Sequence, residues 1–223
     1  MDESTKSKKH WGELEKKVLQ GTGIDIGCGP DPVMPDVKRF DMDDGDANII
    51  TEYVKEQFDY VYSAHCLEHM FYPEKTILEW WKLVKPGGYL FFMVPDEDLY
   101  EQGIFPSIFN PDHKATFTIS KRSSWSPRSY NILDLVNSIP DGKVLKLELQ
   151  DEGYDRTLMS HYSMYSNPKW IHALENMVEG LRLSKKLIQK IIPEWFLSKY
   201  RIKDQTYTNA LAQIACIVQK NSN

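Results

Sequence analysis

The first hundred residues alternate between short apolar runs and segments whose apolar positions follow helical spacing. Short apolar runs rich in aromatic or β-branched residues and bounded by glycine, proline or acidic residues are typical of buried strands. Strands that alternate with helices indicate a mainly parallel sheet. The predicted strands lie at the start of Thr22–Pro30 and at Val37–Phe40, Ala47–Ile50 (a stunted one), Phe58–Ser63 and Tyr89–Val94, and the predicted helices at His10–Leu19 and Glu74–Val84.

The second half of the chain continues this pattern less regularly. Pro127–Ile139 and Pro168–Ile192 have the spacing of amphipathic helices, Lys143–Gln150 is a predicted strand, and Leu211–Gln219 is the last strand, expected to be antiparallel. Polar residues Met1–Lys9 are expected to form a frayed tail. We therefore expect an α/β fold with a doubly wound, mainly parallel sheet.

Composition narrows the class of protein. A chain of 223 residues that is 41% hydrophobic suits one domain spanning residues 1–223. A net charge of -5 gives no overall basic field, so nucleic acid is not an expected partner. No apolar run approaches the roughly 20 residues of a transmembrane helix, and the three cysteines form no CxxC pair. These features predict a cytoplasmic protein without a structural disulfide framework.

The segment Thr22–Pro30, TGIDIGCGP, is the most informative part of the chain. Glycines directly after a buried strand allow the backbone to approach a ligand closely. In dinucleotide sites such a loop opens a helix whose amides bind phosphate, but here Pro30, Pro32 and Pro35 follow and disfavour a helix. The pattern therefore favours a ligand without phosphates, and S-adenosylmethionine has that chemistry.

Acidic residues follow the second predicted strand. Asp41 stands at its carboxyl end, where an open α/β sheet places its ligand crevice, so Asp41 is predicted to bind the two ribose hydroxyls. Asp46 comes five residues later, at a distance suited to adenine. A metal-binding DxD motif at Asp41–Asp43 is the alternative, but it leaves the Gly-Cys-Gly loop unexplained.

Four motifs in order resemble those of the class I S-adenosylmethionine-dependent methyltransferases. They are GIDIGCGP, DMDDGDA, FDYVYSAHCLEHM and LVKPGGYLFFMVPD, and they span residues 20–97, the cofactor-binding half. The resemblance implies a Rossmann-like sheet of seven strands with an antiparallel last strand. YEQGIFPSIFNPDHKATFT and SWSPRSYN are similar to segments of small methyltransferases associated with surface-polysaccharide and sugar modification.

The resemblance also implies a role for each matching residue. Asp25 and the loop Gly27, Cys28 and Gly29 would face the methionine end of the cofactor, and Asp41 the ribose. Met42, Asp46 and Ala47 would face the adenine, and Ser63, Ala64 and His65 the inner side of the cofactor. The proline-rich link between Gly29 and Val37 departs from the family pattern, which shifts the expected positions of the acids by a residue or two.

The sequence His65-Cys66-Leu67-Glu68-His69 matches the HxxEH motif of inverted zinc peptidases. That site needs both histidines on one helical turn. Because the segment follows a strand directly and Pro73 comes soon after, little helix remains, and we predict no metal here. Glu68 and His69 are expected to be packing or capping groups.

Residues 95–130 form a long, aromatic segment at the end of the fifth predicted strand, and residues 155–205 are interpreted as a helical insertion. Long loops inside compact domains are usually binding loops, so we expect the acceptor to bind at 95–130. His113 is the first candidate for the base that removes a hydroxyl proton, and His65 is the second.

Together these observations predict a methyltransferase that methylates an oxygen of a sugar or a similar small polar acceptor. Two alternatives stay open. One is an N-methyltransferase of a small molecule or protein, and the other is a non-catalytic scaffold subunit of the same fold. A homodimer is a further option, because the late helix could pack on a second subunit.

Overall fold

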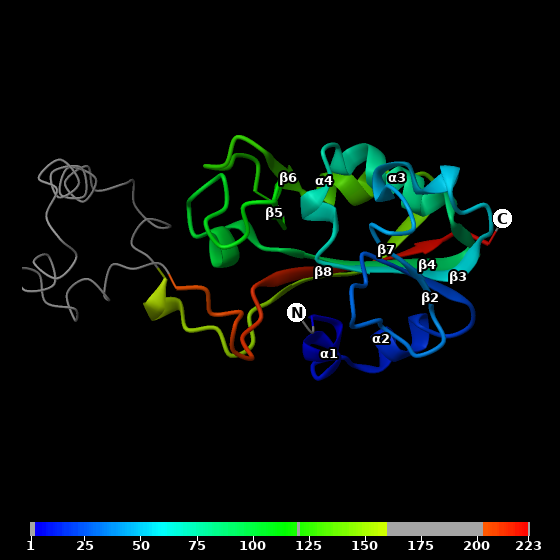
Figure 1. Ribbon diagram of the computed structural model, residues 1–223, viewed down its shortest axis with the longest axis horizontal. Coiled ribbons are helices and arrows are strands. Elements are labelled where there is room, and N and C mark those ends of the chain that lie inside the picture. The colour runs from blue at the N-terminus through cyan, green and yellow to red at the C-terminus, as the bar shows by residue number, and fades with distance from the viewer. Residues whose placement is uncertain (1–2, 120, 160–202, 223) are drawn as a thin grey trace, which may run out of the picture.

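The computed structural model describes residues 3–119, 121–159 and 203–222. Its main sheet has six strands in the order β2-β1-β3-β4-β8-β7 (Figure 1). The strands are β1 (Gly23–Ile26), β2 (Lys38–Phe40), β3 (Phe58–Ala64), β4 (Val84–Pro95), β7 (Gly142–Gln150) and β8 (Gln213–Lys220). The first four strands run parallel, and β8 is antiparallel to both β4 and β7. The predicted α/β class and the antiparallel last strand are confirmed.

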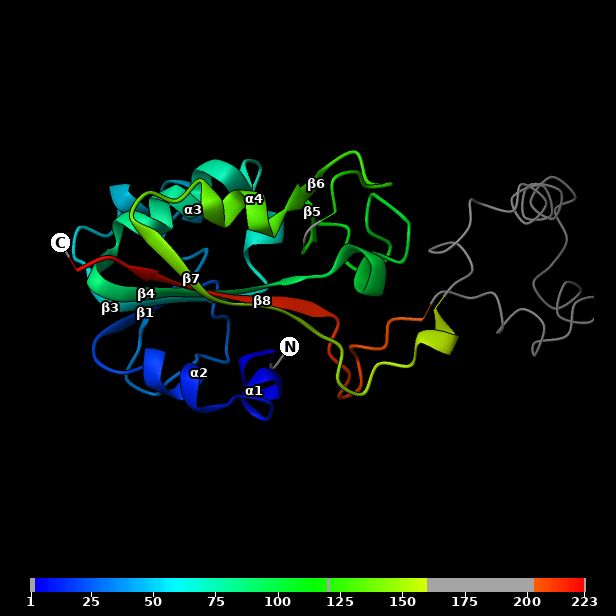
Figure 2. The same cartoon turned by 180° about the vertical axis from the view of Figure 1, so that it is seen from behind.

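Helices cover both faces of this sheet, as Figures 1 and 2 show from opposite sides. One face carries α1 (Glu3–Lys8) and α2 (Glu13–Val18), and the other carries α3 (Pro73–Lys82) and α4 (Ile132–Asn137). The short turns are η1 (Ala47–Glu52), η2 (Leu67–His69), η3 (Glu97–Glu101) and η4 (Arg156–Leu158). A separate two-stranded ladder pairs β5 (Thr116–Thr118) with β6 (Ser129–Asn131).

Alternation along the central strand β3 explains why the sheet carries two apolar layers. Val61 packs in the cluster that includes Trp80 of α3, whereas Tyr60 and Tyr62 pack in the cluster that includes Val18 of α2. All five side chains are almost fully buried. The hydrophobic cores on the two faces therefore hold the carboxyl ends of β1, β2 and β3 in fixed positions.

Several predicted elements have a different form. Ala47–Ile50 is part of a 3₁₀ helix instead of a strand, because Asp46 caps it through the amide of Asn48 and Trp80 binds the carbonyl of Ala47. Most of the expected frayed tail is α1, whose Ser4 and Ser7 are buried. Pro127–Ile139 divides into β6 and α4, since Asn131 caps α4 with its side chain.

The remaining expectations concern the links between elements. Residues 30–37 form turns and bends without a helix, as the prolines predicted. Lys85–Gly88, directly after the predicted helix Glu74–Val84, lies inside the irregular first part of β4. The predicted helix Pro168–Ile192 and most of the insertion 155–205 lie outside the described residues. Among the helices that the structure describes, none has the length and apolar character needed to cross a bilayer.

Candidate active site

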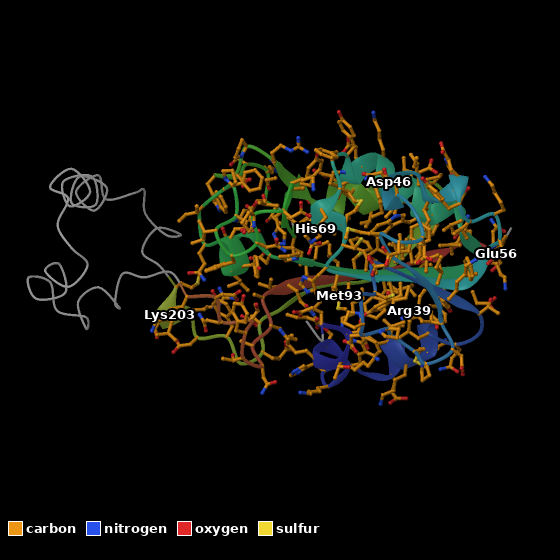
Figure 3. All side chains as sticks on the ribbon, in the orientation of Figure 1. Arg39, Asp46, Glu56, His69, Met93 and Lys203 are labelled. Atoms are coloured by element: carbon orange, nitrogen blue, oxygen red, sulfur yellow. The ribbon has the colours of Figure 1, made fainter. Side chains whose placement is uncertain are left out.

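A cleft opens where β1, β2 and β3 end. It consists of two adjacent cavities, a larger one of about 680 Å³ and a smaller one of about 190 Å³. Both are lined by Gly27, Gly29, His65 and His69, so the glycine loop and the segment after β3 separate the two spaces. Asp46 and His69 lie on the side of the sheet covered by α3 (Figure 3).

The larger cavity is lined by residues from the tip of β2 and from η1. Among them are Asp41, Met42, Asp46 and Ala47, all four predicted to bind the ribose or the adenine. The carboxylate of Asp41 accepts one hydrogen bond from the Gly29 amide at 2.6 Å and one from the Met42 amide at 2.7 Å. Asp41 therefore fixes the glycine loop against the end of the second strand.

Gly27 and Gly29 both have a positive φ, but a side chain would meet different surroundings at the two positions. Gly27 has φ of +74°, and a Cβ there would lie 2.6 Å from the sulfur of Cys66. Gly29 has φ of +52°, and a Cβ there would meet nothing within 4 Å. The first glycine lets the chain pack against the η2 segment, and the second leaves the cleft open.

Asp25 lies inside β1 with only 1% of its surface exposed. One carboxylate oxygen accepts the Val33 amide at 2.6 Å, and the other has no hydrogen-bond partner. Burial raises the pKa of Asp25 to about 7. Neither Asp25 nor Ser63, which donates to the carbonyl of Ile26, is among the residues that line the two cavities.

His65 leaves β3 in a left-handed conformation, with φ of 54°. Its Nε2 lies 2.8 Å from Oε1 of Gln213, and its Nδ1 lies 3.4 Å from Oε1 of Glu68. Burial acts to lower the pKa of His65, but the carboxylate of Glu68 beside its Nδ1, together with Glu3 and Gln213, raises it to about 9. His65 is therefore a charged donor near neutral pH.

His113 comes from the long segment after β4 and forms part of the wall of the smaller cavity. Its Nδ1 lies 2.7 Å from Oε1 of Glu101, and both side chains are almost fully buried. The amides of Lys114 and Ala115 donate to the backbone carbonyl of Glu68, at 2.8 and 3.1 Å. These backbone bonds tie the His113 segment to η2 and place His113 beside the cleft.

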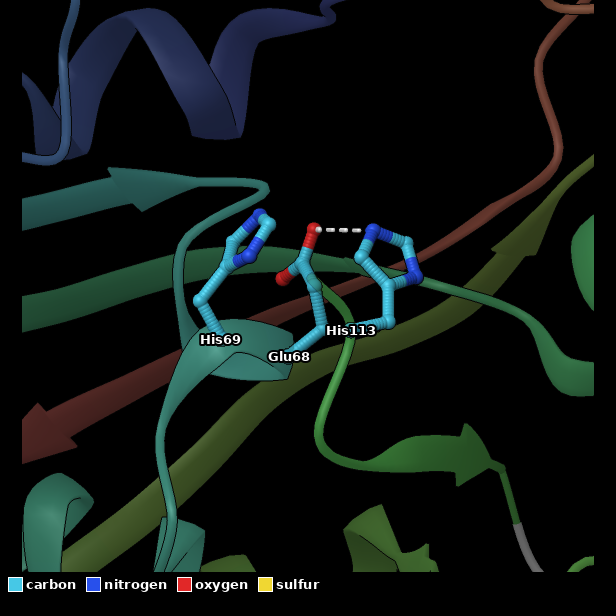
Figure 4. A group of neighbouring side chains, drawn as sticks. All are labelled: Glu68, His69 and His113. Atoms are coloured by element: carbon cyan, nitrogen blue, oxygen red, sulfur yellow. Dashed lines mark ion pairs between the residues drawn. The ribbon is translucent and has the colours of Figure 1, made fainter. Parts of the chain in front are cut away.

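The HxxEH segment has a different arrangement from that of a zinc peptidase. Only Leu67–His69 is helical, and the ring of His65 contacts Gln213 from β8. Glu68 and His69 of this segment lie close to His113, a histidine from outside the segment. Figure 4 shows these two side chains beside His113, with the carboxylate of Glu68 facing the His113 ring. The two imidazoles are in edge contact, with ring centroids 5.0 Å apart.

A family model described as a methyltransferase domain matches residues 11–176. The chain belongs to this methyltransferase family. No curated protein sequence matches the chain at a significant level.

Several solved structures are similar to this methyltransferase. A protein described as a methyltransferase from Bacillus halodurans C-125 is 15% identical, with a TM-score of 0.52, and the match covers 94% of this chain and 97% of that one. A SAM-dependent methyltransferase from Archaeoglobus fulgidus is 16% identical, with a TM-score of 0.48 and coverage of 99% and 95%. Phosphoethanolamine N-methyltransferase 2 of Haemonchus contortus is 14% identical, with a TM-score of 0.44 and coverage of 93% and 51%.

Family and fold together confirm the predicted class, a methyltransferase that uses S-adenosylmethionine. The sequence prediction missed the part that α1 plays in this methyltransferase. Glu3, Ser4 and Lys6 line the smaller cavity, and Thr5 binds both carboxylate oxygens of Asp31 beside the glycine loop. The segment Glu3–Lys8 is polar, and its sequence does not reveal that Ser4 and Ser7 are buried. The role of α1 could therefore not be predicted. Glu101 was also missed, because its pairing with His113 depends on how a long loop folds.

Proposed function

We propose that this methyltransferase methylates a hydroxyl oxygen of a small polar acceptor such as a sugar. The larger cavity is assigned to the nucleoside end of the cofactor and the smaller cavity to the acceptor. The observation that carries this proposal is the buried pair of Glu101 and His113 at the wall of the smaller cavity. A hydroxyl must lose a proton when its oxygen is methylated, whereas a neutral amine already offers a lone pair.

The residues at the larger cavity fit a nucleoside without phosphates. Asp41 supplies carboxylate oxygens at the tip of β2, as a ribose diol requires, and Asp46 and Ala47 border the space assigned to adenine. Asp25 lines neither cavity, but it has one unpartnered buried oxygen, and its place near the methionine amino group stays a prediction. When bound, the cofactor supplies a methyl carbon activated by a positively charged sulfonium.

His113 is assigned the hydroxyl proton. Glu101 accepts a hydrogen bond from Nδ1 and so keeps the proton of a neutral ring on that atom, which leaves the lone pair on Nε2. An imidazole held in this way can accept a proton at Nε2 and is fixed in orientation. His65, the second candidate from the sequence, has both ring nitrogens near the partners Gln213 and Glu68 and suits a positioning part better.

A sugar acceptor is supported by the walls of the smaller cavity. Tyr100 and Asn110 are among the lining residues, and aromatic and polar side chains are the two kinds that contact a sugar ring. The resemblance to sugar-modifying enzymes in the segments after β4 points the same way. Cytoplasmic location and a homodimer stay predictions from the sequence.

The test is a methyl-transfer assay with labelled S-adenosylmethionine and a panel of nucleotide sugars, glycans and amines. We expect a sugar hydroxyl to be methylated. His113→Ala should lower kcat by about 100-fold or more, the usual contribution of a general base, and leave the cofactor Kd unchanged. Glu101→Gln should lower kcat less and shift the pH profile, because the ring loses the carboxylate that orients it.

Three outcomes would contradict parts of this proposal. Full activity of His113→Ala would remove the assigned role of that ring. Methylation of amines alone would favour the N-methyltransferase alternative. Absence of any cofactor binding in calorimetry would favour a scaffold subunit.

A further inference from the structure

Three potential metal-ligating side chains converge at the smaller cavity. Glu68, His69 and His113 each offer a ligand atom, and these atoms all lie within 4.8 Å of one another (Figure 4). Two come from η2, which directly follows β3, and the third comes from the segment that is hydrogen-bonded to η2. The group therefore stands on one of the best-fixed parts of the cleft. All three residues line the smaller cavity.

The carboxylate of Glu68 is buried and accepts no hydrogen bond, although a charged histidine lies near it. Its side chain is 1% exposed, and neither of its oxygens accepts a hydrogen bond. The nearest nitrogens to Oε1 are Nδ1 of His65 at 3.4 Å and Nε2 of His113 at 3.9 Å, both beyond good hydrogen-bond length. A buried carboxylate without hydrogen bonds is costly. The charged ring of His65 compensates part of this cost, and a bound cation would compensate more of it.

Both histidines are held as metal-ligating histidines usually are. Nδ1 of His113 lies 2.7 Å from Glu101, and Nδ1 of His69 lies 2.8 Å from Asp112. Each contact keeps the ring proton on Nδ1 and directs the lone pair to Nε2. Carboxylates in this position orient a metal-binding imidazole and raise its basicity.

We propose that Glu68, His69 and His113 bind one divalent transition-metal cation whose remaining coordination positions open to the acceptor cavity. Two imidazoles and one carboxylate with open positions are a ligand set that Zn²⁺, Fe²⁺ and related ions accept. Tetrahedral bonds of about 2.0–2.2 Å place two ligand atoms roughly 3.3 Å apart, so ligand atoms that lie within 4.8 Å need to close by up to about 1.5 Å. This is a different site from the HxxEH pair, because His65 is not a ligand.

The inference rests on the proposed function for what the cation does. The acceptor hydroxyl would bind at an open position of the cation, which lowers the pKa of that hydroxyl. Nε2 of His113 is then a ligand, and the hydroxyl proton passes to water in the cavity instead of to the ring. In the cation-bound enzyme this replaces the assignment of His113 as the base, and the ring acts on the acceptor oxygen only through the cation.

The experiment uses the full chain with any affinity tag removed, after dialysis against a chelator. Co²⁺ titration followed by visible absorption, and Zn²⁺ titration by calorimetry, should each show one bound cation. His69→Ala should weaken binding roughly 100-fold or more. Asp112→Asn should weaken it about 10-fold, the low end for loss of a carboxylate that holds a ligating imidazole. His10→Ala, a change at an exposed histidine outside the cleft, is the matched control and should bind as the wild type does.

The result that overturns the site is equal cation affinity in wild type and His69→Ala, or absence of binding in the wild type. Activity separates this failure from that of the proposed function. Methylation of a hydroxyl that is unchanged by chelator and by added cation would remove the metal and leave the proposed function intact. One bound cation without methylation of any hydroxyl in the panel would keep the site and remove the proposed function.

Discussion

The buried carboxyl of Asp25 makes the stability of the free enzyme depend on pH. It is 1% exposed, one oxygen has no partner, and burial raises its pKa from 3.8 to about 7. Between these two values the folded state holds a proton that the unfolded state releases, so stability falls as pH rises and levels off above about pH 7. The difference between the two pKa values corresponds to a total loss of stability of about 4 kcal/mol, at about 1.36 kcal/mol for each pKa unit.

Asp25→Asn removes this titration and keeps an oxygen for the Val33 amide. With the same two pKa values, the free energy of unfolding of the wild type falls by about 2.5 kcal/mol between pH 5 and pH 8. The variant should therefore gain about that much stability relative to the wild type over this range. Urea unfolding followed by tryptophan fluorescence, at half-unit steps of pH and without cofactor, measures the difference.

Asp36→Asn, at an exposed aspartate in the turns that follow β1, is the matched control and should follow the wild type. A constant difference between Asp25→Asn and the wild type across the pH range would refute the argument that burial governs this carboxyl. A difference that shrinks with rising pH would show that the charged form is stabilised. Repeating the measurement with saturating S-adenosylmethionine tests whether the amino group of the cofactor lies near Asp25, since a nearby positive charge would lower its pKa and flatten the profile.

Two further changes test the cofactor site and the core. Asp41→Ala should weaken S-adenosylmethionine binding by about 1.5–3 kcal/mol in calorimetry, because the ribose and the Gly29 amide lose a charged acceptor; an unchanged Kd would contradict the ribose assignment. Trp80→Ala should lower the free energy of unfolding by about 3–5 kcal/mol, because this side chain is 0% exposed and donates to the carbonyl of Ala47. Tyr207→Ala, at a side chain that is 77% exposed, should change it by less than about 0.5 kcal/mol, and similar losses for both variants would contradict the core assignment.

The sheet could be predicted from the sequence where local signals and burial agree. Phe58–Ser63 and Tyr89–Val94 are apolar and β-branched or aromatic, and they form the central strands β3 and β4. Ala47–Ile50 has similar composition but forms η1, because the Asp46 cap and a hydrogen bond from distant Trp80 take its backbone groups. Such bonds over a long stretch of sequence cannot be recognised from local pattern.

In the candidate site, too, residues with a local sequence signal were predictable and those that depend on distant contacts were not. The glycine loop, Asp41 and Asp46 were predictable because each directly follows or caps a strand or turn with a motif of its own. The partner of His113 was not, since Glu101 and the contact to η2 depend on a loop that folds back over the cleft. Pro30, Pro32 and Pro35 did predict the absence of a helix, because proline acts on the local backbone alone.

The turns that replace a helix after Gly29 also bear on which other adenine compounds can compete for the cleft. ATP and dinucleotides would have to place their anionic tails where residues 30–37 offer no helix terminus. The adenosine end of such a compound would sit beside the carboxylates of Asp41, Asp46 and Asp112, which line the larger cavity. Abundant nucleotides should thus be poor inhibitors, whereas the demethylated product, which keeps the neutral nucleoside and the amino acid, should be an effective one.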